Sequence, residues 1–247
     1  MAKVAVRVLG CGDAFGSGGR FQTCFFVSAG TDRFLIDCGA TSLVAMRRFA
    51  VDPGAIDTVF LSHLHGDHFA GLPFLLLEAQ FVGQRSRPFT IVGPPGARQR
   101  LLDALEVLFP GSSRMTWRFP LHFVELEPHR TASCGGVAAT AYPVRHPSGA
   151  PSFALRFACG QRLIGYSGDT EWTDQLIEVA SGADLLITEC YAFDRQASHH
   201  LDFKTLSSRR RELQAKRVLL THMSQEMLDR VDGIDWETAE DGLLIEL

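Results

Sequence analysis

The chain has 247 residues, 46% of them hydrophobic and 21% charged, so it can bury a large core and is neither a disordered tail nor a peptide. The formal net charge of −4 gives no general attraction to nucleic acid or to anionic lipid. The longest apolar run, FAGLPFLLL, is far shorter than the roughly 18 residues of a membrane span, and the N-terminus lacks the pattern of a signal peptide. Six cysteines without a CxxC pair favour buried free thiols in a cytoplasmic protein.

Short β-type runs and helical patterns alternate along the chain. In the first half they predict strands over 4–10, 24–29, 33–38, 58–62 and 89–93, and helices over 42–50, 68–81 and 97–109. After a proline-bounded stretch they predict strands over 121–127, 136–144, 152–158, 162–167, 184–189, 217–222 and 242–247, and helices over 173–180, 203–215 and 224–231. Two such halves predict two sheets with helices on their outer faces, a four-layer α/β arrangement in a single domain over 1–247.

The segment SHLHGDHFAGLP places three histidines and one aspartate within six residues: His63, His65, Asp67 and His68. Chance would produce this pattern in roughly one chain of this composition in a thousand. His63 and His65 follow a predicted strand, where side chains two residues apart point to the same face and can bind one ion together. Gly66 permits a sharp turn, after which Asp67 and His68 begin the next helix and can face a second ion.

Three further residues stand at the ends of predicted strands: His146, Asp169 and His222. Strand ends are where open α/β sheets place their sites. Imidazole and carboxylate ligands without cysteine suit zinc best, with manganese or iron as alternatives, and a carboxylate can bridge two ions. The sequence thus predicts two metal sites, with Asp169 bridging them: His63, His65 and His146 at the first, Asp67, His68 and His222 at the second.

HLHGDH, with FLIDCG upstream and YSGDT and LLTH downstream, resembles the metallo-β-lactamase superfamily over nearly the whole chain. The resemblance implies an αββα sandwich and a metal-bridging hydroxide. LGCGDAFGSGGR, GLPFLLLEAQF and TIVGPPG are similar to the branch that contains ribonuclease Z and the cyclic-phosphate phosphodiesterases of phosphonate breakdown. By the same resemblance, Asp37 is a buried acid that holds the histidine-rich loop and supports metal binding without being a ligand.

One segment departs from ribonuclease Z, which carries a long, basic, Gly-rich arm between the third and fourth metal motifs. Here only residues 147–168 separate His146 from Asp169, and they read as a simple hairpin. Without the arm, and with a negative net charge, extended nucleic-acid binding and tRNA processing are disfavoured. The expected substrate is a small phosphodiester or nucleotide.

The segment ITECYAFDRQASHHLDF supplies candidates for proton transfer. Glu189 ends a strand, and His199 and His200 lie in a loop before a helix that Asp202 can cap. The segment resembles the strand-end Glu and the HST loop of ribonuclease Z, although Leu201 and Asp202 replace Ser and Thr. We expect His200, more than His199, to protonate the leaving oxygen, with Glu189 orienting it and Asp67 orienting the attacking hydroxide.

Two other patterns favour ordinary structure. The loop GCGDAFGSGG fails as a dinucleotide motif because Phe15 stands where Gly or Ala is required, and we expect a flexible turn near the mouth of the site. The run 209–211 of three arginines predicts a solvated helix face rather than an RNA contact.

These observations favour a dinuclear metal-dependent phosphodiesterase. Alternatives are a thioester, lactone or β-lactam hydrolase, because the same ions polarise a carbonyl, and ribonuclease Z-like tRNA processing without the arm. A non-catalytic metal-binding protein is disfavoured by the complete ligand set. An oxygen-reducing di-iron centre is least favoured, since that branch carries Glu where His65 stands. The substrate, the native metal and the oligomeric state stay open, and the resemblance is compatible with a homodimer.

Overall fold

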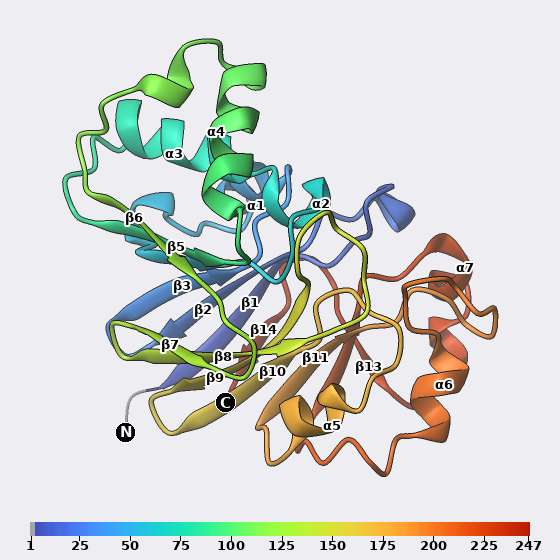
Figure 1. Cartoon of the computed structure of the whole chain (residues 1–247). Helices are drawn as coiled ribbons and strands as arrows, with labels where there is room; N and C mark the ends of the chain where they lie inside the picture. Colours follow the sequence, from blue (N-terminus) through green and yellow to red (C-terminus); the bar gives the residue numbers. More distant parts are fainter. Residues whose placement is uncertain (1–2) are drawn as a thin grey trace.

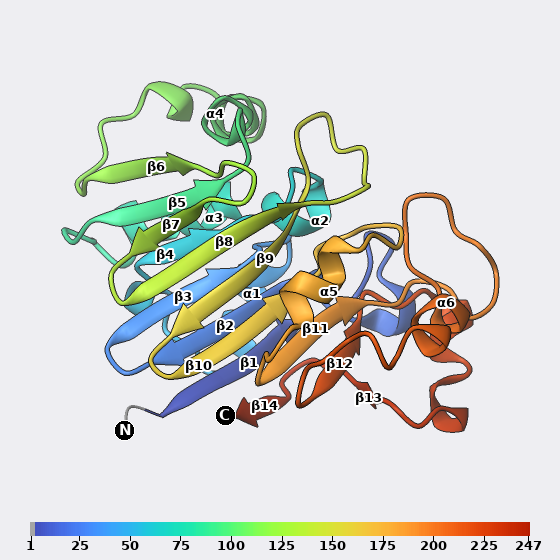
Figure 2. The same cartoon turned by 60° about the horizontal axis from the view of Figure 1, so that its bottom comes forward.

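Two seven-stranded mixed sheets pack face to face and carry helices on their outer faces (Figures 1 and 2). The computed structural model describes residues 3–247. The layers follow the order of the chain, because the first half builds one sheet and the second half builds the other, except for the last strand, which returns to the first sheet. This is the predicted αββα sandwich.

The first sheet has the strand order β14-β1-β2-β3-β4-β5-β6. Its strands β3 to β6 are parallel, and the remaining pairs are antiparallel. The strands are β1 (Val4–Gly10), β2 (Cys24–Ala29), β3 (Asp32–Ile36), β4 (Thr58–Phe60), β5 (Phe89–Gly93), β6 (Leu121–Glu125) and β14 (Leu244–Glu246).

The second sheet has the order β13-β12-β11-β10-β9-β8-β7, with β10 to β13 parallel. Strands β8, β9 and β10 form a continuous antiparallel meander. The strands are β7 (Thr131–Cys134), β8 (Val137–Pro143), β9 (Phe153–Cys159), β10 (Arg162–Tyr166), β11 (Leu185–Glu189), β12 (Val218–Thr221) and β13 (Glu237–Thr238).

Helices cover each sheet through a separate apolar cluster. Leu35, Val59 and Ile91 of the first sheet pack with α1 (Ser42–Arg48), α3 (Leu72–Phe81) and α4 (Ala97–Leu108). Leu186 and Leu220 of the second sheet pack with α5 (Gln175–Ala180), α6 (Phe203–Ser208) and α7 (Gln225–Leu228). A short helix, α2 (Gly66–Phe69), lies at the end of the sandwich.

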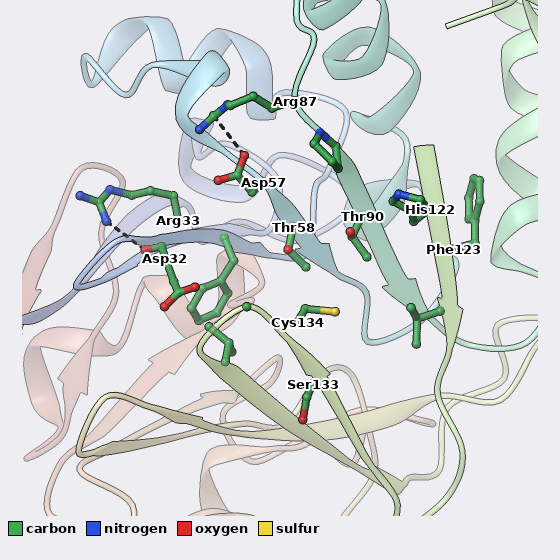
Figure 3. Close-up of a pocket in the computed structure, with 15 residues that line it drawn as sticks. Asp32, Arg33, Asp57, Thr58, Arg87, Thr90, His122, Phe123, Ser133 and Cys134 are labelled. Atoms are coloured by element: carbon green, nitrogen blue, oxygen red, sulfur yellow. Dashed lines mark hydrogen bonds and ion pairs between the residues drawn. The ribbon is translucent and has the colours of Figure 1, made fainter. Parts of the chain in front are cut away.

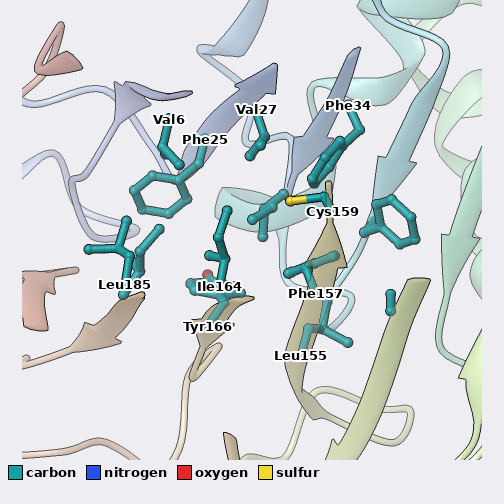
Figure 4. Close-up of a cluster of buried hydrophobic side chains, with 14 of the residues drawn as sticks. Val6, Phe25, Val27, Phe34, Leu155, Phe157, Cys159, Ile164, Tyr166 and Leu185 are labelled. Carbon is teal, nitrogen blue, oxygen red and sulfur yellow. The ribbon is translucent and has the colours of Figure 1, made fainter. Parts of the chain in front are cut away.

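The core between the two sheets is rich in aromatic side chains (Figure 4). Phe34 and Phe60 of the first sheet meet Phe157 of the second, with ring centroids 5.2 to 5.5 Å apart. All three rings are buried, so this packing holds the two sheets in a fixed relation. The fixed relation matters because each sheet supplies part of the site described below.

Two predicted helices differ from the structure. The predicted helix 68–81 is divided between Phe69 and Leu72, because the Gly71 amide donates to the carbonyl of Cys38 (2.9 Å) and Pro73 has no amide proton to continue the helical bonds. The predicted helix 203–215 ends at Ser208, because the chain then turns to bond Gln214 and Lys216 to residues 182–183. The sequence patterns also missed the short strands β7 and β13.

The remaining structural predictions concern thiols, the loop and the membrane. The six cysteines are free, and all except Cys134 are buried. The loop after β1 contains a 3-10 turn and is held by Asp13, whose carboxylate accepts bonds from the amides of Phe15 and Ser17. Within residues 3–247, no helix is long and apolar enough to cross a membrane.

Candidate metal centre

Seven predicted ligands converge at one end of the sandwich, around α2 and the loops that follow β8, β10 and β12 (Figure 1). His63 and His65 leave the end of β4, and His146 follows β8. The ligand atoms of these three histidines lie within 4.8 Å of one another. His146 Nε2 is 2.9 Å from His65 Nδ1. The structure therefore brings together the residues predicted for the first metal site.

The second predicted group is equally compact. Asp67 and His68 lie in α2, and His222 follows β12. Asp67 Oδ2 is 3.1 Å from His222 Nε2 and 3.3 Å from His68 Nε2. All three side chains are buried, so their polar atoms face one another rather than solvent.

Asp169 lies between the two groups. Its Oδ2 is 3.8 Å from the Nε2 atoms of both His63 and His146 and 3.4 Å from His222 Nε2. Its Oδ1 is 3.3 Å from His68 Nε2. One carboxylate thus faces histidines of both groups, which is the arrangement expected of a bridging ligand.

Hydrogen bonds on the outer side of the rings fix which nitrogen faces inward. Ser62 donates its hydroxyl proton to Asp37 (2.7 Å), so it accepts from His63 Nδ1 (3.0 Å). His68 Nδ1 donates to Asp37 (2.7 Å), and His146 Nδ1 donates to the backbone carbonyl of residue 199 (2.9 Å). In its neutral form each of these three imidazoles therefore presents the lone pair of Nε2 to the cluster, as metal-binding histidines do.

Asp37 is the buried acid behind this arrangement. It follows β3, is fully buried, and accepts bonds of 2.7 Å from the amide and hydroxyl of Ser62, from His68 Nδ1 and from the hydroxyl of Tyr166. Burial and the neighbouring Asp37 carboxylate raise the pKa of the Tyr166 phenol well above its usual value, so the phenol remains a donor. These contacts match the supporting role that the resemblance implies for Asp37.

The electrostatics of the cluster favour a cation. Burial tends to lower the pKa of His68 and His222, but the neighbouring carboxylates, Asp169 before Asp67, together outweigh it, raising the pKa of His68 well above its usual value and that of His222 to about 9. Burial lowers the pKa of His146 to about 4. The buried carboxylates thus stabilise positive charge within the cluster, and a divalent ion bound there would supply it.

Unpaired atoms support the same conclusion. His63 Nε2, His68 Nε2 and Asp169 Oδ1 are buried and form no well-directed hydrogen bond, although the last two lie 3.3 Å apart. Buried polar atoms without partners are costly in a folded protein, and here three of them face a single cluster. The donor set of imidazoles and carboxylates therefore fits metal ions.

The predicted proton-transfer residues lie beside the cluster. Glu189 ends β11, and His200 Nδ1 is 3.1 Å from Glu189 Oε2. The His200 ring lies 4.9 Å from the ring of His146 and 5.6 Å from that of His222. The His199 side chain instead is about half exposed, next to Glu171, and its backbone carbonyl is the group that contacts the cluster. His200 is therefore placed at the site, whereas the imidazole of His199 is turned away.

The sequence did not reveal two side chains that shape the site. The Tyr191 ring stacks on His200, with centroids 4.8 Å apart, and Tyr166 bonds to Asp37. Each tyrosine stands at or just after a strand end on the same side of the sandwich as the ligands. Their position at strand ends was the one signal that could have indicated a place near the site, because the sequence around each tyrosine contains no recognisable motif.

A separate cavity of about 720 Å³ lies far from this cluster (Figure 3). Its walls are the starts of β4, β5 and β6, with Thr58, Thr90 and His122, together with Ser133 and Cys134 near the β7–β8 turn. The predicted metal ligands follow strands at the opposite end of the sandwich, so this cavity is not part of the candidate site.

Comparison with known proteins places the chain in a family. The family model described as Anti-Pycsar protein Apyc1 matches residues 4–238. The chain belongs to this family. Ribonuclease Z of Methanosarcina acetivorans is 24% identical, over 93% of this chain and 90% of that protein.

Solved structures show which fold this Apyc1 family member has. The short form of human tRNase Z is 26% identical, with a TM-score of 0.78 over 98% of each chain. YhfI of Bacillus subtilis, a metallo-β-lactamase fold protein, is 23% identical, with a TM-score of 0.77 over 99% of this chain and 100% of its own. The metallo-β-lactamase fold predicted from the sequence is confirmed. Together with the His/Asp cluster, these relatives support a metal-dependent hydrolase.

Proposed function

We propose that the protein is a phosphodiesterase that acts on a small phosphodiester or nucleotide with two zinc ions. The observation that carries the proposal is the pair of ligand groups that share Asp169. The Methanosarcina relative is named a ribonuclease, and ribonucleases hydrolyse phosphodiesters. A phosphodiester is therefore the substrate class that both the ligand cluster and the similarity to this ribonuclease support.

In this proposal His63, His65 and His146 would hold one ion and Asp67, His68 and His222 the other, and Asp169, which faces both groups, would contribute to each. Nitrogen and carboxylate ligands without thiolate suit zinc, and manganese or iron is the alternative. When bound, two such ions lower the pKa of a shared water and neutralise charge on the phosphoryl oxygens.

The chain's own residues supply orientation and a proton. The Asp67 carboxylate orients the attacking water. His200 Nδ1 faces Glu189, so Nε2 is the nitrogen available to donate a proton to the leaving oxygen. Burial tends to lower the pKa of His200, but the hydrogen bond and the charge of Glu189, with the charge of Asp169, together outweigh it and raise the pKa above its usual value, in the direction that favours a proton donor.

The surroundings favour a small substrate. Between His146 and Asp169 the chain forms a short loop and the β9–β10 hairpin, with no extended arm in this segment. The net charge of −4 gives no general attraction to a polynucleotide. Extended nucleic-acid binding is therefore not part of the proposal, and a homodimer stays a prediction.

The test is hydrolysis by zinc-loaded protein of bis(p-nitrophenyl) phosphate, a 2′,3′-cyclic nucleotide, a precursor tRNA, a thioester and a lactone. We expect turnover of the small diesters and little cleavage of the tRNA. His63→Ala should abolish turnover, whereas the control His122→Ala should not, because His122 is an exposed histidine far from the cluster. Efficient tRNA cleavage at physiological salt would contradict the proposal that the substrate is small. Thioester or lactone turnover without diester hydrolysis would contradict the proposed phosphodiesterase activity.

A further inference from the structure

A cavity of about 530 Å³ is lined in part by His200. Its lining also includes Glu171, the start of α6, and Arg145, which precedes a candidate ligand. The His200 ring also lies close to the rings of His146 and His222. His200 therefore borders both this cavity and the ligand cluster, and in the proposed reaction it is the residue that protonates the leaving oxygen.

Two cations face this cavity without a partner. Arg145 and Lys204 line it from positions 59 residues apart in the sequence. Within residues 3–247, neither side chain forms an ion pair or a hydrogen bond. Other cations nearby are engaged, since Arg209 lies over the Trp172 ring (4.7 Å) and Arg230 pairs with Asp194 (3.5 Å).

The carboxylates of the same cavity are already bound within the protein. Glu171 accepts a bond of 2.8 Å from the amide of His199, and Asp194 pairs with Arg230. Asp202 caps α6 and accepts bonds from the amide and hydroxyl of Thr205 (2.7 and 2.8 Å). Each of the three carboxylates is thus engaged by groups of the protein, whereas the side chains of Arg145 and Lys204 keep free donors that can bind an anion by direct contacts.

Hydrogen bonds anchor the backbone of Arg145 and of Lys204. The Arg145 amide donates to Thr170 Oγ1 (3.1 Å), and its carbonyl accepts from the amide of Glu171 (3.2 Å). The Lys204 amide donates to the carbonyl of Phe193 (3.0 Å) in the first turn of α6. Because the backbone of each residue is anchored, only side-chain freedom is lost when an anion binds.

Building on the proposed function, we propose that Arg145 and Lys204 form a subsite for a second anionic group of the substrate, a phosphate or a carboxylate on the leaving-group side of His200. The substrate class is then a phosphodiester whose leaving alcohol carries its own negative charge. One anion is the diester at the cluster, and the other occupies the cavity. Two charge-assisted contacts should improve binding by at least about tenfold.

Binding of nucleotides tests the subsite without turnover. The zinc-loaded protein is titrated by calorimetry with adenosine 3′,5′-bisphosphate and with the 3′- and 5′-monophosphates. We expect the bisphosphate to bind at least about tenfold more tightly than either monophosphate. This ratio should fall in Arg145→Ala and in Lys204→Ala, should reach about one in the variant with both substitutions, and should be largely kept in Arg145→Lys and in the control Arg211→Ala, an exposed residue outside the cavity. Equal affinities in the wild type, or a ratio unchanged in both alanine variants, would overturn the subsite.

A kinetic comparison separates this proposal from the proposed function. Two dinucleotides that differ only in a terminal 3′-phosphate share the same reacting diester, and the phosphorylated one should show the higher kcat/KM. Hydrolysis of both at equal kcat/KM, with equal nucleotide affinities, overturns the subsite and leaves the phosphodiesterase standing. Hydrolysis of neither, with the bisphosphate preference intact, overturns the phosphodiesterase and supports the anion site.

Discussion

Asp37→Asn tests the support of the metal cluster without removing a ligand. The Asp37 backbone has a φ of 57°, which Asn tolerates better than Ala, so the substitution adds little backbone strain. The carboxylate accepts four bonds, with Oδ2 taking those from His68, Tyr166 and the Ser62 hydroxyl, and Oδ1 taking the Ser62 amide. An amide offers one oxygen, so one side of this network meets N–H groups instead of an acceptor.

The cost follows from which side is lost. With the amide oxygen in the Oδ2 position, the buried amide of Ser62 loses its acceptor, which costs about 1–3 kcal/mol. The reverse orientation places N–H groups against His68 Nδ1 and moves the proton of that ring to Nε2, the atom that faces the cluster. Either way His68 loses a charged partner, and such losses reduce metal affinity by about 10- to 100-fold. That reduction removes a further 1.4–2.7 kcal/mol or so of metal-dependent stability.

The assay combines zinc titration against a chromophoric chelator with urea unfolding, with and without EDTA. Asp37→Asn should lose about 1–3 kcal/mol in EDTA and visibly more in zinc. The matched control is Tyr166→Phe, which removes one donor to the same carboxylate but leaves His68 paired, so its zinc affinity should stay close to wild type. A zinc affinity of Asp37→Asn within about twofold of wild type would refute the idea that this acid positions His68 for metal.

Three further predictions follow from the site and the core. Elemental analysis of zinc-reconstituted protein should approach two ions per chain, and a reproducible value near zero would remove the metal assignment. His200→Ala should keep the ions while losing about 10²- to 10⁴-fold in turnover of a nucleotide diester and much less in turnover of a p-nitrophenyl ester, whose leaving group needs no proton. His199→Ala should reduce turnover of both esters by less. An equal, slight effect of His200→Ala on both esters would contradict its role as proton donor. Phe157→Ala should lower the free energy of unfolding by about 3–5 kcal/mol in urea titrations, whereas a loss below 1 kcal/mol or so would show that the sheets are not held by this packing.

Strands were predicted well where their limits depend on local pattern. The bounds of β1, β2 and β5 agree with the sequence prediction at both ends, because alternating or continuous apolar runs stop at Gly or turn residues there. Helix α6 was predicted too long because its end depends on residues 182–183, which are distant in sequence. Two-residue β13 was missed because so short a strand exists only by pairing with β12.

The clustering of the candidate ligands could be predicted because these residues are chemically distinctive and stand at strand ends, which the topology brings to one edge. The residues that hydrogen-bond to them could not be predicted. Tyr166 and Ser62 act through one buried carboxylate, and neither residue type signals such a role by itself. Nor could a role for Arg145 be predicted, because the proposed role depends on Lys204 lining the same cavity.

Backbone strain adds a feature of the site that composition cannot reveal. Among residues 3–247, six non-glycine residues have positive φ, and three of them belong to the site: Asp37, His199 and His222. Such conformations cost of order 1–2 kcal/mol each and persist where surrounding contacts fix them. At His199 the strained turn directs a carbonyl to His146 Nδ1, and at His222 the amide is bonded to the carbonyl of Cys11. The energy stored there is offset by the packed sheets, so the orientation of the ligands depends on the stability of the whole sandwich.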